Sequence, residues 1–522
     1  MTASTMTLKY QRLRTPDEDG QSLQVPPLAE FPETLAANQQ TLATHEFSLL
    51  GESIHGVREQ ARADLYKRAV AWTSQYRDVS ADGPGDGFVL AGHQPTLFHP
   101  GVWYKNFSLH RLAQNCQLSG INLVIDNDLS ALSSIRVPTG SVSNPQIKNI
   151  HFDDGSSLGP YEAEALSNPE TFRSFGRRVY KAIQGFVDDP LVGRLWPYVI
   201  AAEAKLKNPA WAIAAGRHRL EQDFGLQTLE VPLSQLCASE PFAAFAGELV
   251  SRAPELREMH NRALLKYRQL HRIRSHSHPV PELAAVDGWI EVPFWIWRCE
   301  QPRRNRLFVH VDDQWILVSD LESIEIKLDR ADLAGQLVQL ERAGVCLRPR
   351  ALTTTMYARL VLSDALVHGI GGAKYDQLTD QIIGEFFGAQ PPQFNILTAT
   401  HRLPLPVQLV DDHELTQLDV QLRQLTWHAD KYGDLNTDQL RELANQKQQL
   451  LREVPAEDKK AWHDRVAEIN QRLQPGVAGT RDLLTRQRAA LVDQLAASRL
   501  LGSREFSFCL FDERLVEQLR VE

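Results

Sequence analysis

Short apolar runs alternate with helical patterns over most of the chain. Residues 87–92 and 121–125 are apolar runs, and residues 103–116 between them carry apolar side chains at helical spacing. Buried parallel strands have continuous apolar runs of this kind. A strand, a helix and a second strand in this order predict a βαβ unit.

The same alternation continues along the chain. Helical patterns fill residues 160–225, and further helices are expected at 353–366 and 374–387. Additional strands are predicted at 228–232, 289–297, 306–310, 314–318, 345–350 and 394–398. Strands that alternate with helices predict an α/β fold, here a Rossmann-like parallel-sheet core with insertions.

The pattern changes after residue 406. Leu415, Leu418, Leu422 and Leu425 form a heptad stripe, and similar stripes follow to about residue 500. Such stripes need a partner helix, which a second chain or a hairpin of the same chain can supply. We expect a helical, coiled-coil-like arm and favour a homodimer through these helices, with a helical bundle packed on the core as the alternative.

These changes of pattern divide the chain into four segments. They are an N-terminal arm with helices at 1–80, the Rossmann-like core at 81–408 with a helical insert at 160–225, the coiled-coil arm at 409–500, and a tail at 501–522 that returns to the core.

Composition narrows the class of protein. The 522 residues are 43% apolar and 23% charged, and 56 Lys and Arg against 65 Asp and Glu give a net charge of −9. This composition excludes a disordered chain, and the negative charge argues against nucleic-acid binding, which needs a basic surface. The first residues lack the apolar region of a secretory signal, and no apolar run approaches the roughly 20 residues of a membrane span. We therefore expect a cytoplasmic protein without a membrane partner.

The cysteines are scattered and show no C-x-x-C spacing. An odd number of isolated cysteines predicts free thiols in a reducing cytosol. Each is expected to be a small packing residue of the core and not a catalyst. The five are Cys116, Cys237, Cys299, Cys346 and Cys509.

Residues 92–105 follow the first predicted strand and open a helix. Ligands of open α/β sheets bind beyond the carboxyl ends of the strands, and the start of the next helix favours an anion. Gly92, His93 and Gln94 would face that crevice, and Lys105 would add a positive charge. The alternative is a proline-rich turn with satisfied polar groups. We favour a functional role for His93 and Gln94, and we leave Lys105 open.

Asp126, Asn127 and Asp128 end the second predicted strand. In a parallel sheet they would lie beside the first loop, where adjacent carboxylates could bind a metal, orient an amine or act as a base. An Asx turn that caps the following segment explains the same residues. Both interpretations remain open.

Residues 368–376 are rich in glycine and precede a predicted helix. Gly371 and Gly372 would allow a phosphate or a carboxylate to approach the backbone, with Lys374, Tyr375 and Asp376 as contacts. The spacing of a P-loop is absent, so the segment predicts a ligand-facing helix start and no particular cofactor.

Four arginines lie near the end of an apolar strand and could face an acidic ligand or form a solvated loop. They are Arg298, Arg303, Arg304 and Arg306. The net charge of −9 thus describes the whole chain and not the expected cleft, where His, Arg and Lys cluster.

The sequence resembles the bacillithiol biosynthesis cysteine-adding enzyme family. The turn Gly92-His93-Gln94 looks like the family's Gly-Gln-Gln or Gly-His-Gln turn, and Tyr104-Lys105 fits its next helix. Asp126-Asn127-Asp128 stands where the family has Asp-His-Asp, with Asn127 in place of the histidine. The stretch from Leu352 to Tyr375, with its Gly371-Gly372 turn, resembles a later helix and loop.

The resemblance implies a nucleotidyltransferase-type Rossmann core and a C-terminal coiled coil that forms a homodimer. It also implies a carbon–nitrogen ligase step that joins cysteine to an amino-sugar conjugate. Our hypothesis is broader: a small-molecule ligase or transferase in which His93 is the acid or base, Gln94 orients the substrate, and Asp126 and Asp128 bind an amine. The alternative is a non-catalytic nucleotide- or metabolite-binding homodimer. The cofactor is not identified, a nucleotide is the candidate, and no metal is predicted.

Overall fold

The computed structural model describes residues 13–79, 83–130, 133–155, 159–405 and 410–521. They form two compact units. The core unit contains the described residues within 1–137, 148–402 and 504–522, and the helical unit contains those within 138–147 and 403–503.

The core unit is built on a six-stranded sheet in the order β1-β16-β15-β4-β5-β8. Its strands are β1 (Gln21–Val25), β4 (Phe88–His93), β5 (Ser119–Val124), β8 (Leu229–Pro232), β15 (Ala365–His368) and β16 (Phe394–Thr400). All neighbours pair in parallel except β1, which runs antiparallel to β16. The α/β class and the predicted βαβ unit of β4, α3 (Pro100–Asn115) and β5 are confirmed.

The strand order places two sequence-distant strands at the centre. From β4 the chain adds β5 and β8 on one side, and later adds β15 and β16 on the other. The direction of strand addition therefore reverses between β4 and β15. In open α/β sheets, a reversal of this kind creates a crevice at the carboxyl ends of the strands.

Two elements of this sheet differ from the prediction. Residues 21–25 form a strand where the pattern indicated an arm, and the expected helix at 353–366 is three elements. The helix α11 (Ala351–Tyr357) passes into a π-helical turn at Ala358–Leu362, and β15 follows at once. Buried residues run from 352 to 367 without a glycine or proline, so the apolar pattern alone could not separate the helix from the strand.

A second, antiparallel sheet has the order β13-β12-β11-β10-β14, with the short β9 (Ala285–Val286) paired to β10. Its other strands are β10 (Trp289–Arg298), β11 (Gln301–Val311), β12 (Trp315–Ser319), β13 (Glu325–Asp329) and β14 (Val345–Pro349). One apolar cluster joins the two sheets, since it contains Leu90 and Ile121 as well as Phe294 and Ile296. This shared core fixes the second sheet relative to the first.

Helices cover the core unit. They are α1 (Phe31–Ala43), α2 (Ile54–Thr73), α4 (Pro169–Ile183), α5 (Val192–Leu206), α6 (Pro209–Asp223), α7 (Leu233–Cys237), α8 (Glu240–Ser251), α9 (Ala253–Leu270), α10 (Leu333–Arg342), α12 (Ile370–Phe386) and α18 (Arg514–Val521). The helical insert predicted at 160–225 corresponds to α4, α5 and α6. Short hairpins are formed by β2 (Ser48–Leu49) with β3 (Glu52–Ser53) and by β6 (Ser134–Ser141) with β7 (Asn144–His151).

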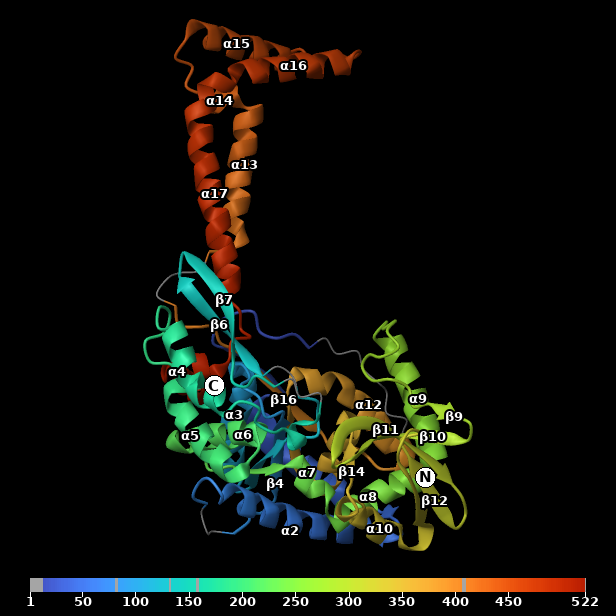
Figure 1. Ribbon diagram of the computed structural model, residues 1–522. Coiled ribbons are helices and arrows are strands. Elements are labelled where there is room, and N and C mark those ends of the chain that lie inside the picture. The colour runs from blue at the N-terminus through green and yellow to red at the C-terminus, as the bar shows by residue number, and fades with distance from the viewer. Residues whose placement is uncertain (1–12, 80–82, 131–132, 156–158, 406–409, 522) are drawn as a thin grey trace. The chain divides into compact units, whose positions relative to one another are not determined.

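The helical unit contains α13 (Asp412–Trp427), α14 (Ala429–Tyr432), α15 (Asp438–Arg452), α16 (Lys459–Leu473) and α17 (Ala478–Leu501). Within it α13 packs along α17, and α15 packs along α16 (Figure 1). The apolar stripes thus find helical partners in the same chain, around a small core with Leu425, Leu443 and Leu473. Among the described residues, no helix is both long enough and apolar enough to cross a membrane.

Candidate functional site

A cavity of about 930 Å³ lies at the carboxyl ends of β4, β5, β15 and β16. It brings together most of the residues that the sequence singled out. The predicted residues in its lining are Gly92, His93, Gln94, Lys105, Asn127, Asp128, Arg304, Gly371, Gly372, Lys374 and Tyr375. Those outside the lining are Asp126, Asp376, Arg298, Arg303 and Arg306.

The loop after β4 and the loop after β5 are joined by hydrogen bonds. Gln94 Nε2 donates to Oδ2 of Asp128 at 3.0 Å. Arg304 Nη1 donates to Oδ1 of Asp128 at 3.0 Å and to the carbonyl oxygen of Asn127 at the same distance. Asp128 keeps 43% of its side chain exposed, so its carboxylate is held in position and can still contact a ligand.

Asp126 has a structural role and lies outside the cavity lining, so its catalytic role stays a prediction without support from its position. Its side chain is fully buried. Oδ1 accepts a hydrogen bond from the Ser234 amide at 3.0 Å, and Oδ2 accepts from the Ser234 hydroxyl at 2.5 Å and from Trp211 Nε1 at 3.0 Å. Burial raises the pKa of this carboxyl group, while these donors counteract the rise. Both oxygens are therefore occupied away from the cavity.

Asn127 connects the loop after β5 to the second sheet. Its Nδ2 donates to the carbonyl oxygen of Pro349 at 2.7 Å, and only 4% of the residue is exposed. Although Asn127 belongs to the cavity lining, this amide group is already used. Asn127 therefore positions β14, and its place among the substrate-binding residues stays a prediction.

His93 is a neutral imidazole at neutral pH. Burial, and then the positive charge of Lys105, lower its pKa to about 3. His93 Nδ1 lies 3.1 Å from the carbonyl oxygen of Gln94. A carbonyl can only accept, so we assign the proton to Nδ1 and the lone pair to Nε2. His93 Nε2 can therefore accept a hydrogen bond from a ligand.

Lys105 fixes the turn that carries His93. Its Nζ donates to the carbonyl oxygen of Gly92 at 3.0 Å, and 4% of the residue is exposed. Burial, and then the positive charge of Arg217, lower the pKa of Lys105 to about 8. The ammonium group thus remains charged at neutral pH, but by a small margin.

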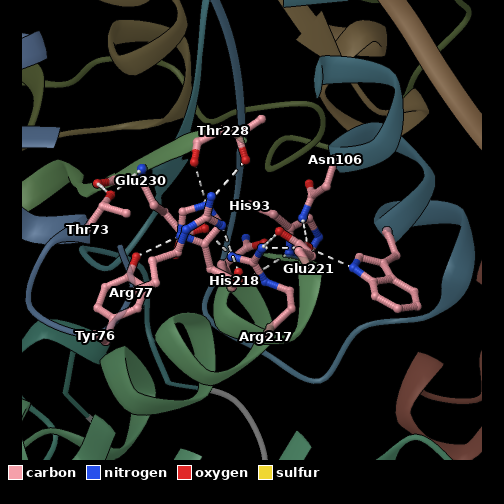
Figure 2. Close-up of polar contacts among 12 residues, drawn as sticks. Thr73, Tyr76, Arg77, His93, Asn106, Arg217, His218, Glu221, Thr228 and Glu230 are labelled. Carbon is pink, nitrogen blue, oxygen red and sulfur yellow. Dashed lines mark hydrogen bonds and ion pairs between the residues drawn. The ribbon is translucent and has the colours of Figure 1, made fainter. Parts of the chain in front are cut away.

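A buried ionic network lies next to this turn (Figure 2). Arg217 Nη1 donates to Glu221 at 2.8 Å, and its Nη2 pairs with Glu230 on β8. Trp103 and Asn106 of α3 each donate to Glu221 Oε1 at 2.7 Å. The network therefore ties α3 to α6 and β8, and it fixes the Arg217 charge that acts on Lys105 and His93.

Around the same network, His218 and Tyr76 form a second branch. Tyr76 Oη lies 2.8 Å from His218 Nδ1, and His218 Nε2 lies 2.9 Å from the carbonyl oxygen of Thr228. Burial lowers the pKa of His218 well below its ordinary value and raises that of Glu230 to about 7. These groups hold the framework together and lie outside the cavity lining.

His368 is the functional candidate that the sequence did not single out. It ends β15, lines the cavity, and its Nε2 lies 3.0 Å from Oδ2 of the fully buried Asp376. Thr355 and Thr379 donate to Asp376 Oδ1 at 2.7 and 2.9 Å. Burial alone would raise the pKa of Asp376, but His368 and Arg359 outweigh burial and lower it. Asp376, expected to contact the ligand, is instead an ionised carboxylate that orients His368.

Gly372 is required by the position of His368. A Cβ atom at residue 372 would lie 2.3 Å from His368 Nδ1, whereas one at Gly371 would meet nothing within 4 Å. The two glycines of the predicted ligand-facing turn therefore have different functions. Gly372 makes room for the histidine, and Gly371 leaves open space at the start of α12.

The start of α12 is suited to an anion. Gly369, Ile370 and Gly371 line the cavity, and no side chain caps the helix at Gly369. The first amides of a helix point outward and carry a partial positive charge. Lys374 in the second turn also lines the cavity. These groups fit a phosphate or carboxylate of a ligand.

The second sheet adds an arginine-rich wall. The guanidinium carbons of Arg304 and Arg350 lie 4.7 and 4.2 Å from the ring centre of Trp295. Arg350 Nη1 pairs with the buried Glu291 at 2.8 Å, but its Nε and Nη2 are buried without a hydrogen-bond partner in the described chain. Arg350 therefore keeps two unsatisfied donors beside the cavity.

The charge of the lining is opposite to that of the whole chain. Its basic side chains are Lys105, Arg304, Arg350, Lys374 and Arg504, and its acidic side chains are Asp128 and Glu505. No group of three or more His, Cys, Asp or Glu side chains that could hold a metal ion occurs within the described ranges. The cavity as a whole favours an anionic small molecule.

Comparison with known proteins does not add to these observations. No protein-family model matches the chain. A search of the curated proteins found no match either.

Proposed function

We propose that the protein is a ligase or transferase that joins an amine to an anionic small molecule in this cavity. The observation that carries the proposal is the convergence of three separate polar loops on one cavity. They follow β4, β5 and β15, at the edge where the strand order reverses. Substrate sites of open α/β sheets lie at this position.

The strand order supports a Rossmann-like core of the nucleotidyltransferase type. In chain order, the five parallel strands run third, second, first, fourth and fifth across the sheet. This is the order of doubly wound nucleotide-binding sheets. A nucleotide is therefore the cofactor candidate. Its phosphates would fit at the start of α12 near Gly371 and Lys374, and it would supply an activated leaving group.

The lining residues suggest a division of roles. Arg350 binds the anionic group of one substrate, the first amides of α12 bind the phosphates of the nucleotide, and Asp128 binds the amine of the other substrate. The lone pair of His93 accepts a hydrogen bond from the amine and orients it for attack. Asp376 is a positioning residue, because it acts through His368.

The resemblance to the cysteine-adding enzymes of bacillithiol biosynthesis makes the proposal more specific. On this basis the reaction joins cysteine to an amino-sugar conjugate. The retained Gly92-His93-Gln94 turn and its contact with Asp128 support this assignment. Cysteine would then be a substrate, and the protein's own thiols would take no part.

The proposal can be tested by ligand-induced stabilisation and by product analysis. We expect cysteine, an amino-sugar conjugate or a nucleotide to raise the melting temperature, because a ligand that binds only the folded state stabilises it. Arg350→Met and Asp128→Ala should abolish the rise, and mass spectrometry should detect a condensation product with the wild type only. The control is Arg303→Met, whose side chain is 77% exposed outside the lining. If both cavity variants respond like this control, the proposal fails.

The second candidate is a non-catalytic metabolite-binding protein with the same fold. The observation that favours it is Asn127, since its amide is bound to Pro349 and cannot act as the family's histidine would. This candidate predicts the same ligand-induced rise in melting temperature, lost in the same variants. No condensation product would form under any combination of ligands.

We also propose a homodimer through the helical unit. Several large apolar side chains remain exposed there, namely Val420, Trp427, Val454, Leu483 and Val492, each at 41% or more. Light scattering of the purified chain should give twice the monomer mass. Trp427→Glu with Leu483→Glu should return it to the monomer, and a wild-type monomer would refute the proposal.

A further inference from the structure

The second sheet brings two cysteines into contact. Cys299 directly follows β10, and Cys346 lies in β14, the neighbouring antiparallel strand. The residues are 47 positions apart in the chain, yet their Sγ atoms are 2.7 Å apart. The Cys299 amide continues the ladder by donating to the carbonyl oxygen of Gly344 at 2.9 Å. Strand pairing therefore holds the two thiols together.

The pair differs from a core contact and from a metal site. Cys299 is exposed and Cys346 is 6% exposed, so one thiol is open to solvent and the other lies behind it. No third potential metal ligand joins them within the described residues. Sequence spacing gave no sign of this pair, because only the β10–β14 pairing brings it together.

We propose that Cys299 and Cys346 are a redox modification site that forms a reversible intramolecular disulfide with a low-molecular-weight disulfide as oxidant. Their sulfur atoms need to move only about 0.7 Å closer to reach bonding distance. The proposal does not depend on the proposed function of the cavity.

The reaction has two exchange steps. The exposed Cys299 thiolate attacks one sulfur of the small disulfide, which forms a mixed disulfide and releases one small thiol. The Cys346 thiolate then attacks Cys299 Sγ, which closes the intramolecular bond and releases the second small thiol. The two protein thiols lose two protons and two electrons, and the small disulfide gains them.

The surroundings set the order of these steps. Burial raises the pKa of the Cys346 thiol, which slows its reaction with external reagents. Cys299 is therefore the entry point, and Cys346 reacts because it is already in contact. The closed bond would tie the end of β10 to β14, two strands that also carry Trp295 and Pro349 of the cavity wall.

The test uses the full-length reduced protein and glutathione disulfide as the probe. After incubation and removal of the probe, thiols are counted in denaturant and the cross-link is mapped by peptide mass spectrometry. We expect the thiol count of the wild type to fall from five to three. A peptide pair joined through Cys299 and Cys346 should appear, and a reductant should restore all five thiols.

Three variants identify the role of each thiol. Cys346→Ser should stop at a glutathione adduct on Cys299, and Cys299→Ser should keep its four remaining thiols. Cys116→Ser is the matched control and should lose two thiols like the wild type. The oxidised wild type should also melt at a higher temperature than the reduced form, because the cross-link restricts the unfolded chain.

Several results would overturn the proposal, and they do not require the variants to fold. They are a wild type that keeps five thiols, a wild type in which the adduct on Cys299 persists unresolved, and a cross-link that involves Cys116, Cys237 or Cys509. A cross-link between two chains, seen on a non-reducing gel, would equally exclude an intramolecular site.

Discussion

The two central strands, β4 and β15, both end in a histidine that lines the cavity, but the two histidines are held in different ways. His93 is oriented by a backbone carbonyl oxygen, and burial keeps it neutral. His368 is oriented by the buried carboxylate of Asp376, which is itself held by two threonines. His93 thus depends on a backbone contact, whereas His368 depends on a buried carboxylate that also lies 3.6 Å from Arg359.

The difference has an energetic consequence. A backbone hydrogen bond contributes little net stability, whereas removing one member of a buried ion pair leaves an uncompensated charge. Substitutions on the β15 side should therefore lower the free energy of unfolding. Substitutions on the β4 side should weaken ligand binding before they lower stability. The following predictions test this asymmetry.

The largest effect is expected from Asp376→Ala. This change removes one of the two carboxylates beside the almost fully buried Arg359, which keeps Asp380 at 2.6 Å, and it leaves His368, Thr355 and Thr379 without their shared partner. We expect the free energy of unfolding to fall by about 3 kcal/mol or more, measured by urea denaturation. His93→Ala on the β4 side should cost about 1 kcal/mol. Equal losses for the two variants would contradict the asymmetry.

A smaller effect is expected from Gly372→Ala. The added Cβ would lie 2.3 Å from His368 Nδ1, so the imidazole has to turn away. Overpacking of this kind costs about 1–3 kcal/mol, and ligand-induced stabilisation should disappear with it. Gly371→Ala is the matched control, because nothing lies within 4 Å of its Cβ and alanine favours the helix. A control that is destabilised as much as Gly372→Ala would show that the helix start, and not His368, is sensitive.

The next prediction concerns the pH dependence of stability, to which His93 on the β4 side contributes. The pKa of His93 is about 3 in the folded protein against 6.5 for an ordinary histidine, so between these values the unfolded chain binds the proton and the folded protein does not. Stability is therefore lost as the pH falls through this window. His99 and His260, whose pKa values burial lowers to about 4, add to the loss.

The variant His93→Asn isolates this contribution. The slope of unfolding free energy against pH, measured by urea denaturation between pH 4 and 6, should decrease by about 1 kcal/mol per pH unit. At pH 7.5 and above, the same variant should show no such difference in slope. An unchanged acid slope would mean that His93 is protonated as readily in the folded protein as in the unfolded chain.

The asymmetry also explains what the sequence could predict. The β4 loop was predicted because its polar residues follow a clear apolar strand and precede a helix, as do Asp126 to Asp128 after β5. Local pattern could not tell Asp128 from Asp126, because the difference depends on Ser234 and Trp211, which are far away in the sequence. The pattern also missed β15, whose apolar residues merge with the preceding helix.

The role of His368 was missed for the same reason. Without β15 as a strand, the histidine has no defined position at the edge of the sheet, and the sequence assigns Asp376 to a ligand rather than to the histidine. Two facts could have been combined: a histidine before a glycine pair, and an acidic residue in the second turn of the following helix. The arginine wall of Arg304 and Arg350 depends on a second sheet that packs against the first, and no local pattern predicts that packing.

The smallest effect on stability should come from Asp128→Asn, which tests the β4 side where it meets the loop after β5. Asp128 is 43% exposed, and its partners Gln94 and Arg304 can also donate to the amide oxygen of asparagine. A partly exposed ion pair contributes less than about 1 kcal/mol, so the urea midpoint should hardly move. If Asp128 binds the substrate amine, the affinity for the ligand, measured from ligand-induced stabilisation, should fall about tenfold, because a charge-assisted hydrogen bond is lost.

Asp126→Asn, two positions away, should have the opposite effects. It should lower the urea midpoint, because buried hydrogen bonds are lost, and it should leave the affinity of the remaining folded protein unchanged. If the two variants behave alike, the carboxylates do not have the separate roles that their burial and partners indicate.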